Sequence, residues 1–555
     1  MRELYFREGI RYLARILELV DRNRLSPTYG CFDRSFWHYR TSDFPSGMYQ
    51  ECVLPLAMVY TLNHPENPYF HEERIKELAA AGIDFACRSS HREGSCDDYF
   101  PYERASGATA FSLYALTEAC LLLKIDSQDL LKFFRKRGRY LALRGFNEAG
   151  VLSNHKALIV LALYNVFLLT RDPFFKKAAE KRRDDLLRLQ KGEGWFPEYE
   201  GCDPGYLTFT IDFLAKYHKK SEDESVLGPL LRAVEFAGHF MHPDGSYGGE
   251  YGSRNTFHFV PHGFEWMAHY LPVAAETAGA FLKSVQSGTR SYLDDDRIFC
   301  HYVYNYLQAY QDYAPRSGKT PPPPSLSPDG GEGEKPRGGL TPFRGGGEGE
   351  ETKFFKEAGL LVKKSKEHYA VISIAKGGVM KVFRGEKLVY SDCGLVGAAH
   401  DGRKFTSQVM GDFKHEIQED KLVIEGSCYF YENLIFSPLK FLLFRIFLVS
   451  AGRLLPANWI RKVLQNKAIL RKKKFPLRFR KEIDFPSLGS ISYFLIPERG
   501  CPPLKELWIG TDSTFIYVAA SQPCQKGCLL PWIDVSSVLS RLNAGESAVF
   551  QYHLS

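Results

Sequence analysis

Residues 151–170 read VLSNHKALIVLALYNVFLLT, and this stretch decides the fold. After the first turn, apolar side chains occupy nearly every face of the predicted helix, and a helix that is apolar all round lies in a protein interior. Most of its polar residues are at the start, where Asn154 and His155 stand next to each other. Capping is one explanation, because an Asn side chain accepts hydrogen bonds from the free N–H groups of a first turn. A functional site is the other, and the rest of the chain adds support to it.

Two kinds of helical segment alternate over the first 310 residues. One kind carries a charged face and is expected outside, whereas the other is apolar nearly all round and is expected inside. The apolar segments start roughly every 50 residues, a period typical of helical arrays. Outer–inner pairs at this period predict an α/α toroid, closed or open, which we take as incomplete; a straight solenoid is the alternative. The outer segments are 5–21, 68–88, 127–142, 173–190 and 223–240, and the inner ones are 49–62, 105–124, 155–170, 205–217 and 261–282.

Long polar loops precede the inner helices. They are rich in Trp, Tyr, His, Arg and acidic residues and cover 33–48, 96–104, 147–154, 192–204 and 242–260. Because the inner helices of a toroid all point the same way, these loops gather at one mouth. The helix N-termini there present free N–H groups and partial positive charge, which favour anions. The sequence therefore predicts an anion-binding cleft at this mouth.

The composition changes twice after the helical part. Residues 313–352 are rich in Pro and Gly with almost no apolar residue, which predicts a flexible linker. From 353 to 555, short alternating or β-branched runs are separated by turn residues, which predicts an antiparallel β-sandwich. We therefore expect a catalytic helical domain at 1–312, followed by the linker and the sandwich.

One stretch of the β domain, near 434–481, begins apolar and ends strongly basic. Pro438, Lys440 and Arg445 interrupt its apolar part, so it is a poor transmembrane span. We favour a helical insertion packed on the sandwich with a solvated basic face. The alternative is an amphipathic segment in peripheral contact with an anionic membrane.

The bulk properties of the 555 residues set weaker limits. A net charge of +7 is compatible with an anionic substrate or membrane surface. The N-terminus lacks the apolar core and cleavage site of a signal peptide, and the 12 Cys show no zinc-site spacing. These features predict a cytoplasmic protein with reduced thiols, or one held at the inner membrane face. The basic cluster near 471–481 has no recognition fold around it, so nucleic acid is not an expected partner.

A helical toroid followed by a β-sandwich, with Asn-His opening one inner helix and Tyr opening the next, resembles the heparinase II/III-like polysaccharide lyases and the related two-domain alginate lyases. In that family the Asn-His pair, matched here by Asn154 and His155, contacts the carboxylate of a uronic acid. The family's Tyr, matched here by Tyr206 in GCDPGYLTF, transfers protons. FFKEAGLLV at 354–362 resembles the opening of the family's β domain.

The chain departs from that family in the sandwich. The family commonly carries a His-Gly-His-Ala-Asp-like motif there, which supplies a catalytic or metal-binding His. Residues 391–408 of this chain hold one His, His400. A structural metal is therefore not a firm expectation, no cofactor is required, and the second catalytic group stays open.

The resemblance implies β-elimination next to a uronic acid. The enzyme must neutralise the carboxylate with preorganised donors, and it must supply a base for the proton at C5 and an acid for the leaving oxygen. We expect Asn154, His155 and Arg254 to bind the carboxylate. Tyr206 is expected to act as base, acid or both, although it is equally compatible with a core Tyr. The candidates for its partner are His258, His262 and His400.

Further side chains are predicted to bind the glycan. Trp37, His38, Tyr39 and Arg40 are expected on one wall, and Tyr102, Glu103, Arg104, Tyr251 and His262 elsewhere in the cleft. Simpler alternatives exist, because Glu103 and Arg104 suit a surface ion pair and Arg254 suits a structural pair with Glu250 or Glu265.

Three rival functions remain at this stage. A toroid glycoside hydrolase would use two carboxylates, for which the candidates are Asp97, Asp98, Glu198, Asp203, Asp212 and Glu250. A uronyl C5-epimerase would abstract the same proton without breaking the chain. A non-catalytic protein of exopolysaccharide biosynthesis would bind an acidic polysaccharide or oligosaccharide. The oligomeric state is not predicted.

Overall fold

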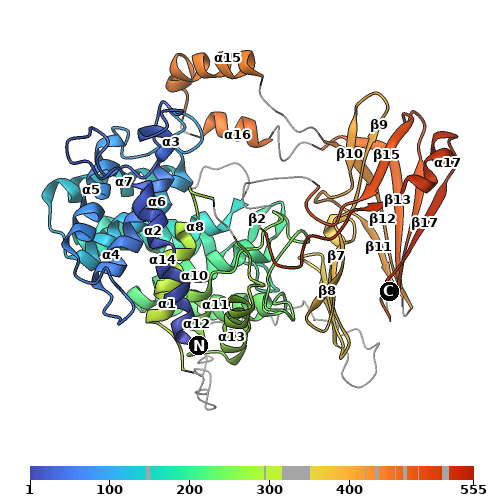
Figure 1. Ribbon diagram of the computed structural model, residues 1–555, viewed down its shortest axis with the longest axis horizontal. Coiled ribbons are helices and arrows are strands. Elements are labelled where there is room, and N and C mark those ends of the chain that lie inside the picture. The colour runs from blue at the N-terminus through green and yellow to red at the C-terminus, as the bar shows by residue number, and fades with distance from the viewer. Residues whose placement is uncertain are drawn as a thin grey trace.

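The computed structural model describes residues 1–145, 151–292, 295–315, 351–418, 420–431, 437–456, 458–466, 472–484, 487–514 and 524–554. Its N-terminal part is helical and its C-terminal part is built of antiparallel sheets, as the sequence predicted (Figure 1). Most of the predicted linker, residues 316–350, lies outside the described residues.

Within the described residues, six helix pairs form a ring. Each inner helix contacts its outer partner and the next inner helix, and α14 contacts α4, so the ring returns on itself. The straight solenoid is therefore wrong and the toroid is confirmed, although the ring is closed and not incomplete as predicted. The inner helices are α4 (Val53–Thr61), α6 (Ser106–Leu123), α8 (Ser153–Thr170), α10 (Pro204–Ser221), α12 (Pro261–Met267) and α14 (Cys300–Gln311). Their outer partners are α5 (Glu73–Ser89), α7 (Gln128–Arg144), α9 (Pro173–Leu187), α11 (Leu227–Gly238), α13 (Pro272–Ser287) and α1 (Arg2–Ile10), and α2 (Leu13–Leu19) and α3 (Arg34–Trp37) precede α4.

The inner helices are buried because their apolar residues surround the helix axis. In α8 every residue from Ala157 to Val166 is buried. The outer helix α5 instead buries one stripe that includes Ile75, Leu78 and Ile83, as its charged opposite face requires. Helix α6 is long and apolar enough to cross a membrane, but 83% of that stretch is buried inside the protein, as in a core helix.

The prediction of a single inner helix over 261–282 is wrong. The chain breaks after Met267, so that α12 is the inner helix and α13 is an outer one. Pro272 explains the break, because a residue before proline is disfavoured in the helical conformation, and Leu271 is extended with φ −143°. The sixth inner helix, α14, was not predicted, because many Tyr and Gln side chains obscure the apolar pattern of CHYVYNYLQAYQ.

The β part is a sandwich of two antiparallel sheets. The five-stranded sheet has the order β4-β5-β6-β7-β8, and the nine-stranded sheet has the order β16-β15-β9-β10-β12-β13-β14-β17, with β11 paired to β12. Ile372 from the first sheet and Phe479 from the second share one core. The strands are β4 (Glu351–Phe355), β5 (Leu360–Lys364), β6 (His368–Ser373), β7 (Val379–Arg384), β8 (Lys387–Asp392), β9 (Leu395–Ala399), β10 (Lys404–Thr406), β11 (Lys414–Ile417), β12 (Lys421–Tyr431), β13 (Lys474–Asp484), β14 (Ser490–Pro497), β15 (Leu504–Ile509), β16 (Ile533–Asp534) and β17 (Ala548–His553).

The five-stranded sheet faces the ring. The phenyl group of Phe355 packs on the phenyl group of Phe236, which belongs to the helical domain, with centroids 4.8 Å apart. Lys376 reaches across and donates to the main-chain oxygens of Glu250 at 2.8 Å and Gly252 at 2.6 Å. Burial lowers the pKa of Lys376 to about 7. These contacts fix the loop between α11 and α12 against the sandwich.

The helical insertion predicted near 434–481 packs on the ring, so the prediction that it packs on the sandwich is wrong. Leu448 shares a small apolar cluster with Phe100 of the ring. Nδ2 of Asn458 donates to Oγ of Ser106 at 2.8 Å. Because Ser106 opens α6, the insertion lies over the N-terminal ends of the inner helices (Figure 1). Its two helices are α15 (Pro438–Val449) and α16 (Trp459–Gln465).

Candidate active site

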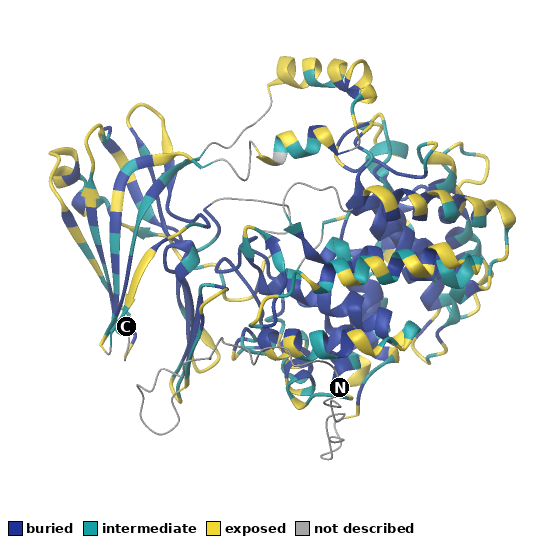
Figure 2. Cartoon of the chain, turned by 180° about the vertical axis from the view of Figure 1, so that it is seen from behind, coloured by how far each residue is buried: buried dark blue, intermediate teal, exposed yellow. Residues whose placement is uncertain are grey.

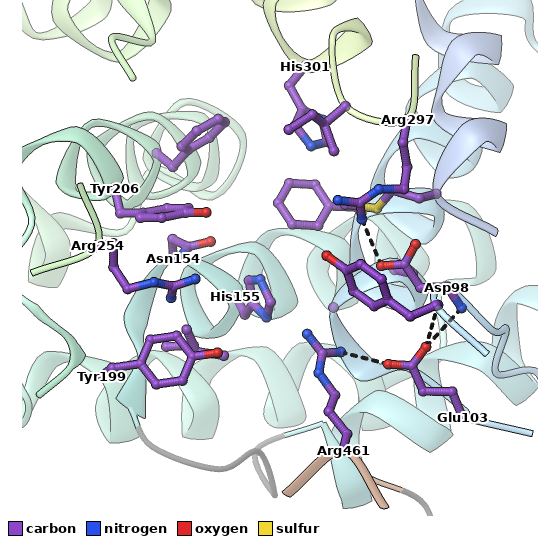
Figure 3. A pocket seen from close by; sticks show the side chains of 18 of the residues that line it. Asp98, Glu103, Asn154, His155, Tyr199, Tyr206, Arg254, Arg297, His301 and Arg461 are labelled. Atoms are coloured by element: carbon purple, nitrogen blue, oxygen red, sulfur yellow. Dashed lines mark hydrogen bonds and ion pairs between the residues drawn. The ribbon is translucent and has the colours of Figure 1, made fainter. Parts of the chain in front are cut away.

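A pocket of about 360 Å³ lies at the mouth of the ring (Figure 3). Helix N-termini are suited to anions because their N–H groups and dipoles point outwards, and this pocket sits on several of them. Four inner helices contribute residues of their first turns to the lining of the pocket. These residues are Gly107 and Ala108 of α6, Asn154 and His155 of α8, Tyr206 of α10 and His301 of α14. The remaining lining residues are Met48, Asp98, Tyr99, Phe100, Glu103, Phe111, Leu152, Tyr199, Phe209, Arg254, His258, Arg297, Ile298, Arg461 and Leu464.

Asp203 joins two of the predicted site residues. It is the N-cap of α10, where its Oδ1 accepts the N–H of Tyr206 at 2.9 Å. Its Oδ2 accepts the N–H of Arg254 at 2.8 Å, and Thr256 donates its hydroxyl to the same carboxylate. A single buried carboxylate therefore fixes Tyr206 and Arg254 relative to each other.

The guanidinium of Arg254 lies between two aromatic rings. Its central carbon is 4.0 Å from the ring centroid of Tyr199 and 5.0 Å from that of Tyr206. The suggested structural partners are engaged elsewhere, because Glu250 pairs with Lys381 at 2.9 Å and Glu265 accepts the hydroxyl of Tyr5 at 2.8 Å. Arg254 is thus a buried cation that faces the pocket (Figure 3).

His258 and Tyr206 form an uncharged pair beside that cation. Their ring centroids are 5.0 Å apart in an edge-to-face arrangement. Nδ1 of His258 shares a hydrogen bond with the hydroxyl of Tyr302. Burial, assisted by the positive charges of His301 and Arg254, lowers the pKa of His258 to about 3. Burial also raises the pKa of Tyr206 well above its usual value, so at neutral pH the imidazole is a free base and the phenol keeps its proton.

The side chain of Asn154 does not cap α8, so the capping interpretation is wrong. The N-cap residue, Leu152, makes no side-chain cap, and the N–H and Nδ2 of Asn154 instead donate to Oε1 of Glu198 at 2.8 and 2.9 Å. Glu198 is held there by the pairing of β1 (Val151–Leu152) with β2 (Pro197–Tyr199), in which it lies opposite Leu152. Burial raises the pKa of Glu198 to about 8, against the hydrogen bonds from Asn154.

Replacing Glu198 by Gln is expected to flatten the pH dependence of stability. The folded-state pKa is raised, so the native state binds more protons than the unfolded state between about pH 4.5 and pH 8, and stability falls as pH rises through this window. One such group contributes up to about 1.4 kcal/mol per pH unit. Urea unfolding of wild type and Glu198→Gln at pH 5 and pH 8 checks this, and equal pH slopes for the two proteins would contradict it.

His155 and His301 complete the floor of the pocket. The imidazole of His301 stacks on Phe111 with centroids 4.5 Å apart and forms an ion pair with Glu51. Burial alone lowers the pKa of His301, but the Glu51 carboxylate outweighs it and raises the pKa to about 9. His301 is therefore a cation at neutral pH. Sequence reasoning missed it, because it lies on the inner helix that was not predicted.

The opposite wall holds two carboxylates, each paired with Arg. Arg297 pairs with Asp98 at 2.9 Å, and Arg461 pairs with Glu103 at 3.4 Å. Burial raises the pKa of Glu103 to about 7, against the charge of Arg461. Arg461 comes from α16 of the insertion, so it reaches the pocket from the other half of the chain (Figure 3). Neither Arg was predicted, because nothing local in the sequence distinguishes it from a solvated surface charge.

Of the predicted site residues, Asn154, His155, Tyr206, Arg254, His258 and Glu103 line this pocket. The others do not. Trp37 donates to the carbonyl of Leu19, Tyr39 is 59% exposed, and Tyr251 shares a hydrogen bond with His242. The residues outside the pocket are Trp37, His38, Tyr39, Arg40, Tyr102, Arg104, Tyr251, His262 and His400.

His262 and Arg104 have structural partners. Nδ1 and Nε2 of His262 each lie 2.8 Å from a carboxylate oxygen, of Asp212 and Asp312 respectively. Arg104 pairs with Glu93 at 3.3 Å, so the suggested Glu103–Arg104 surface pair does not form.

His400 is exposed in the turn between β9 and β10, where its neighbour Asp401 pairs with Arg403 at 2.5 Å. In the described part of the chain, the one group of three close side chains that suits a metal is Glu51, Cys300 and His301 in the ring, and none is in the sandwich. The residues around His400 therefore do not fit the metal-binding motif of the resembled family.

No protein-family model matches the sequence, and a search of curated proteins finds no match. Solved structures with a similar fold include a chondroitin AC lyase from Streptomyces coelicolor A3, with 10% identity, a TM-score of 0.46 and coverage of 92% of this chain and 68% of that chain. A heparinase III matches with 10% identity, a TM-score of 0.40 and coverage of 90% and 71%. An unsaturated glucuronyl hydrolase specific for heparin matches with 12% identity, a TM-score of 0.37 and coverage of 48% and 85%. The structural neighbours are thus polysaccharide lyases and glucuronyl hydrolases.

Proposed function

We propose that the protein is a polysaccharide lyase that cleaves a uronic-acid-containing glycan by β-elimination. The observation that carries the proposal is the triplet of Tyr206, His258 and Arg254 in one pocket. The neutral imidazole of His258 and the buried guanidinium of Arg254 each lie 5.0 Å from the ring centroid of the Tyr206 phenol. These are the acid, the base and the carboxylate ligand that β-elimination requires.

Arg254 and Asn154 are assigned to the substrate carboxylate. A guanidinium in a buried site stabilises the negative charge that builds up on the carboxylate when C5 loses its proton. The amide of Asn154 reaches the same region of the pocket (Figure 3). Its orientation is coupled to Glu198, because a protonated Glu198 can donate to the amide oxygen and so turn the NH₂ group towards the substrate.

His258 is assigned as the base and Tyr206 as the acid. The imidazole takes the proton from C5, the electron pair forms the C4–C5 double bond, and the bond from C4 to the glycosidic oxygen breaks. Tyr206 gives its proton to that oxygen. Proton transfer from His258 to the Tyr206 phenolate then restores the two neutral groups, whose ring centroids are 5.0 Å apart.

The carboxylates of the pocket fit a hydrolase less well. Inverting and retaining hydrolases place two carboxyl groups on either side of the scissile bond. Asp98 and Glu103 lie together on one wall, and each is paired with an Arg (Figure 3). The other predicted acids, Asp97, Glu198, Asp203, Asp212 and Glu250, do not line the pocket.

The product distinguishes these functions. Purified protein is incubated with heparosan, heparan sulfate, hyaluronan, alginate, polyglucuronate and bacterial exopolysaccharides, and near-UV absorbance of unsaturated uronate is followed. A rising signal on one substrate supports the lyase. New reducing ends without the signal indicate a hydrolase, exchange of the C5 proton with solvent indicates an epimerase, and binding alone indicates a non-catalytic protein; each of these outcomes contradicts the proposal.

Replacing Gly107 by Ala is expected to lower kcat/KM by about tenfold or more without loss of stability. A Cβ at this position lies 2.7 Å from Cε1 of His155, so the imidazole must move. Ala in a helix is more favourable than Gly by about 1 kcal/mol, which offsets the cost of the shift. Gly279→Ala in α13 is the matched control, because its Cβ meets nothing within 4 Å. Equal activity of both variants on the product assay would show that the position of His155 is unimportant.

A further inference from the structure

Helix α15 turns an apolar face towards solvent. In Figure 2 it projects from the body of the protein and is exposed over most of its length. Leu439 is 65% exposed, Leu443 58% and Ile446 52%. Leu454, between the two helices, is 80% exposed, and Trp459 at the start of α16 is 46% exposed. Contiguous exposed apolar surface of this kind marks a site that another apolar phase covers.

The helix is held in this orientation by its opposite face. Leu448 is buried beside Phe100, and Phe444 packs edge-on against the same ring with centroids 6.0 Å apart. Arg445 pairs with Asp43 at 3.3 Å. These specific contacts with the helical domain therefore hold the apolar face of α15 towards solvent.

The segment around this face carries positive charge alone. Between Glu432 and Glu482 the sequence holds 13 Lys and Arg residues and no Asp or Glu. Some of these cations have acidic partners in the ring or the sandwich, among them Arg461 and Lys481. Others are exposed beside the apolar face or at the base of the insertion, including Lys440 and Arg453.

We propose that the α15–α16 insertion docks the protein on an anionic lipid bilayer. A helix with exposed Leu, Phe and Ile side chains, an interfacial Trp and surrounding cations has the composition of helices that lie in the membrane interface. The 12 residues of α15 are too few to span a bilayer, so the helix lies along the surface. Charge complementarity selects anionic lipid over a neutral surface, and the insertion itself, which has no acidic residue, has few ion pairs to offer the insertion of a second copy. The proposal does not rest on the proposed lyase activity, because docking requires no catalysis.

Flotation of the full-length protein with lipid vesicles tests the proposal. We expect wild type to float with vesicles of phosphatidylcholine containing phosphatidylglycerol, and at least about tenfold less with phosphatidylcholine alone, because each basic residue near an anionic surface contributes about fivefold to binding. High salt should weaken the interaction. The double variant Leu443→Glu with Ile446→Glu should lose binding by about tenfold or more. Both side chains are exposed, so the variant should unfold like wild type.

The matched control is Leu25→Glu with Leu529→Glu, which places the same charges on two exposed leucines outside the insertion, 93% and 78% exposed. It should bind vesicles like wild type. Failure of wild type to bind anionic vesicles, or binding by the Leu443→Glu, Ile446→Glu variant equal to wild type, overturns the proposal. So does a wild-type dimer in sedimentation that this variant dissociates without any vesicle binding, since a second copy would then cover the face.

Discussion

Replacing Tyr206 by Phe is expected to lower turnover of the acidic glycan by about 10³-fold, within the range that one general acid contributes. The change removes the hydroxyl and keeps the ring, so the packing against His258 and beside Arg254 should remain. The leaving oxygen would then depart without a proton. Initial rates of unsaturated uronate formation by wild type and variant measure the effect.

Tyr199→Phe is the matched control for this prediction. Tyr199 lies on the other side of the same guanidinium, with 4.0 Å from its ring centroid to the central carbon of Arg254, and its hydroxyl also reaches the pocket (Figure 3). We expect its rate to fall less than about tenfold, because no proton transfer is assigned to it. Equal losses in the two variants would mean that the phenols act only through the position of Arg254, and Tyr206 would not be the proton donor.

Replacing Arg254 by Gln is expected to lower kcat/KM by about 10²–10³-fold, the usual loss when one preorganised donor to a developing negative charge is removed. Most of the loss should appear in kcat, because the charge on the carboxylate group grows as C5 loses its proton. Steady-state kinetics on the substrate found in the product assay give kcat and KM separately.

Arg297→Gln provides the comparison across the pocket. Arg297 is a half-buried cation on the opposite wall, and its charge is balanced by Asp98 at 2.9 Å. We expect a loss of about tenfold that appears mainly in KM. A rise in KM at constant kcat for Arg254→Gln would show that Arg254 binds substrate and transition state equally, and would contradict its assigned role.

Much of the architecture could be predicted from the sequence, because the inner helices from α4 to α10 are apolar on nearly all faces and the outer helices are not. The interior of α8, from Ala157 to Val166, leaves no face for solvent. The same reasoning failed for α12 to α14, where a proline and several Tyr residues decide the path of the chain. The sequence also could not predict where the α15–α16 insertion packs, because the pattern of a half-buried helix does not show which surface the helix covers.

The site was predictable where the helices position it. Asn154, His155 and Tyr206 stand at the starts of inner helices, so placing those helices in a ring brings the side chains together. Tyr199 and Arg461 could not be predicted as site residues, because their place in the pocket depends on contacts between segments far apart in the chain. The role of Glu198 could not be predicted either, because a buried carboxylate that supports Asn154 cannot be distinguished from a catalytic acid by sequence alone.

Arg461 and Glu103 lie 358 residues apart in the chain, and their ion pair closes one wall of the pocket. During synthesis the helical ring emerges from the ribosome long before the α15–α16 insertion, which covers its mouth, has been made. At the usual 5–20 residues per second, roughly 20–70 s pass between the synthesis of the two partners. During that time Glu103 is incompletely buried and lacks its ion-pair partner, Arg461. The nascent ring is thus a helical scaffold with an open mouth, and the pocket takes its final shape only when the second half of the protein has been made and has folded back onto the first.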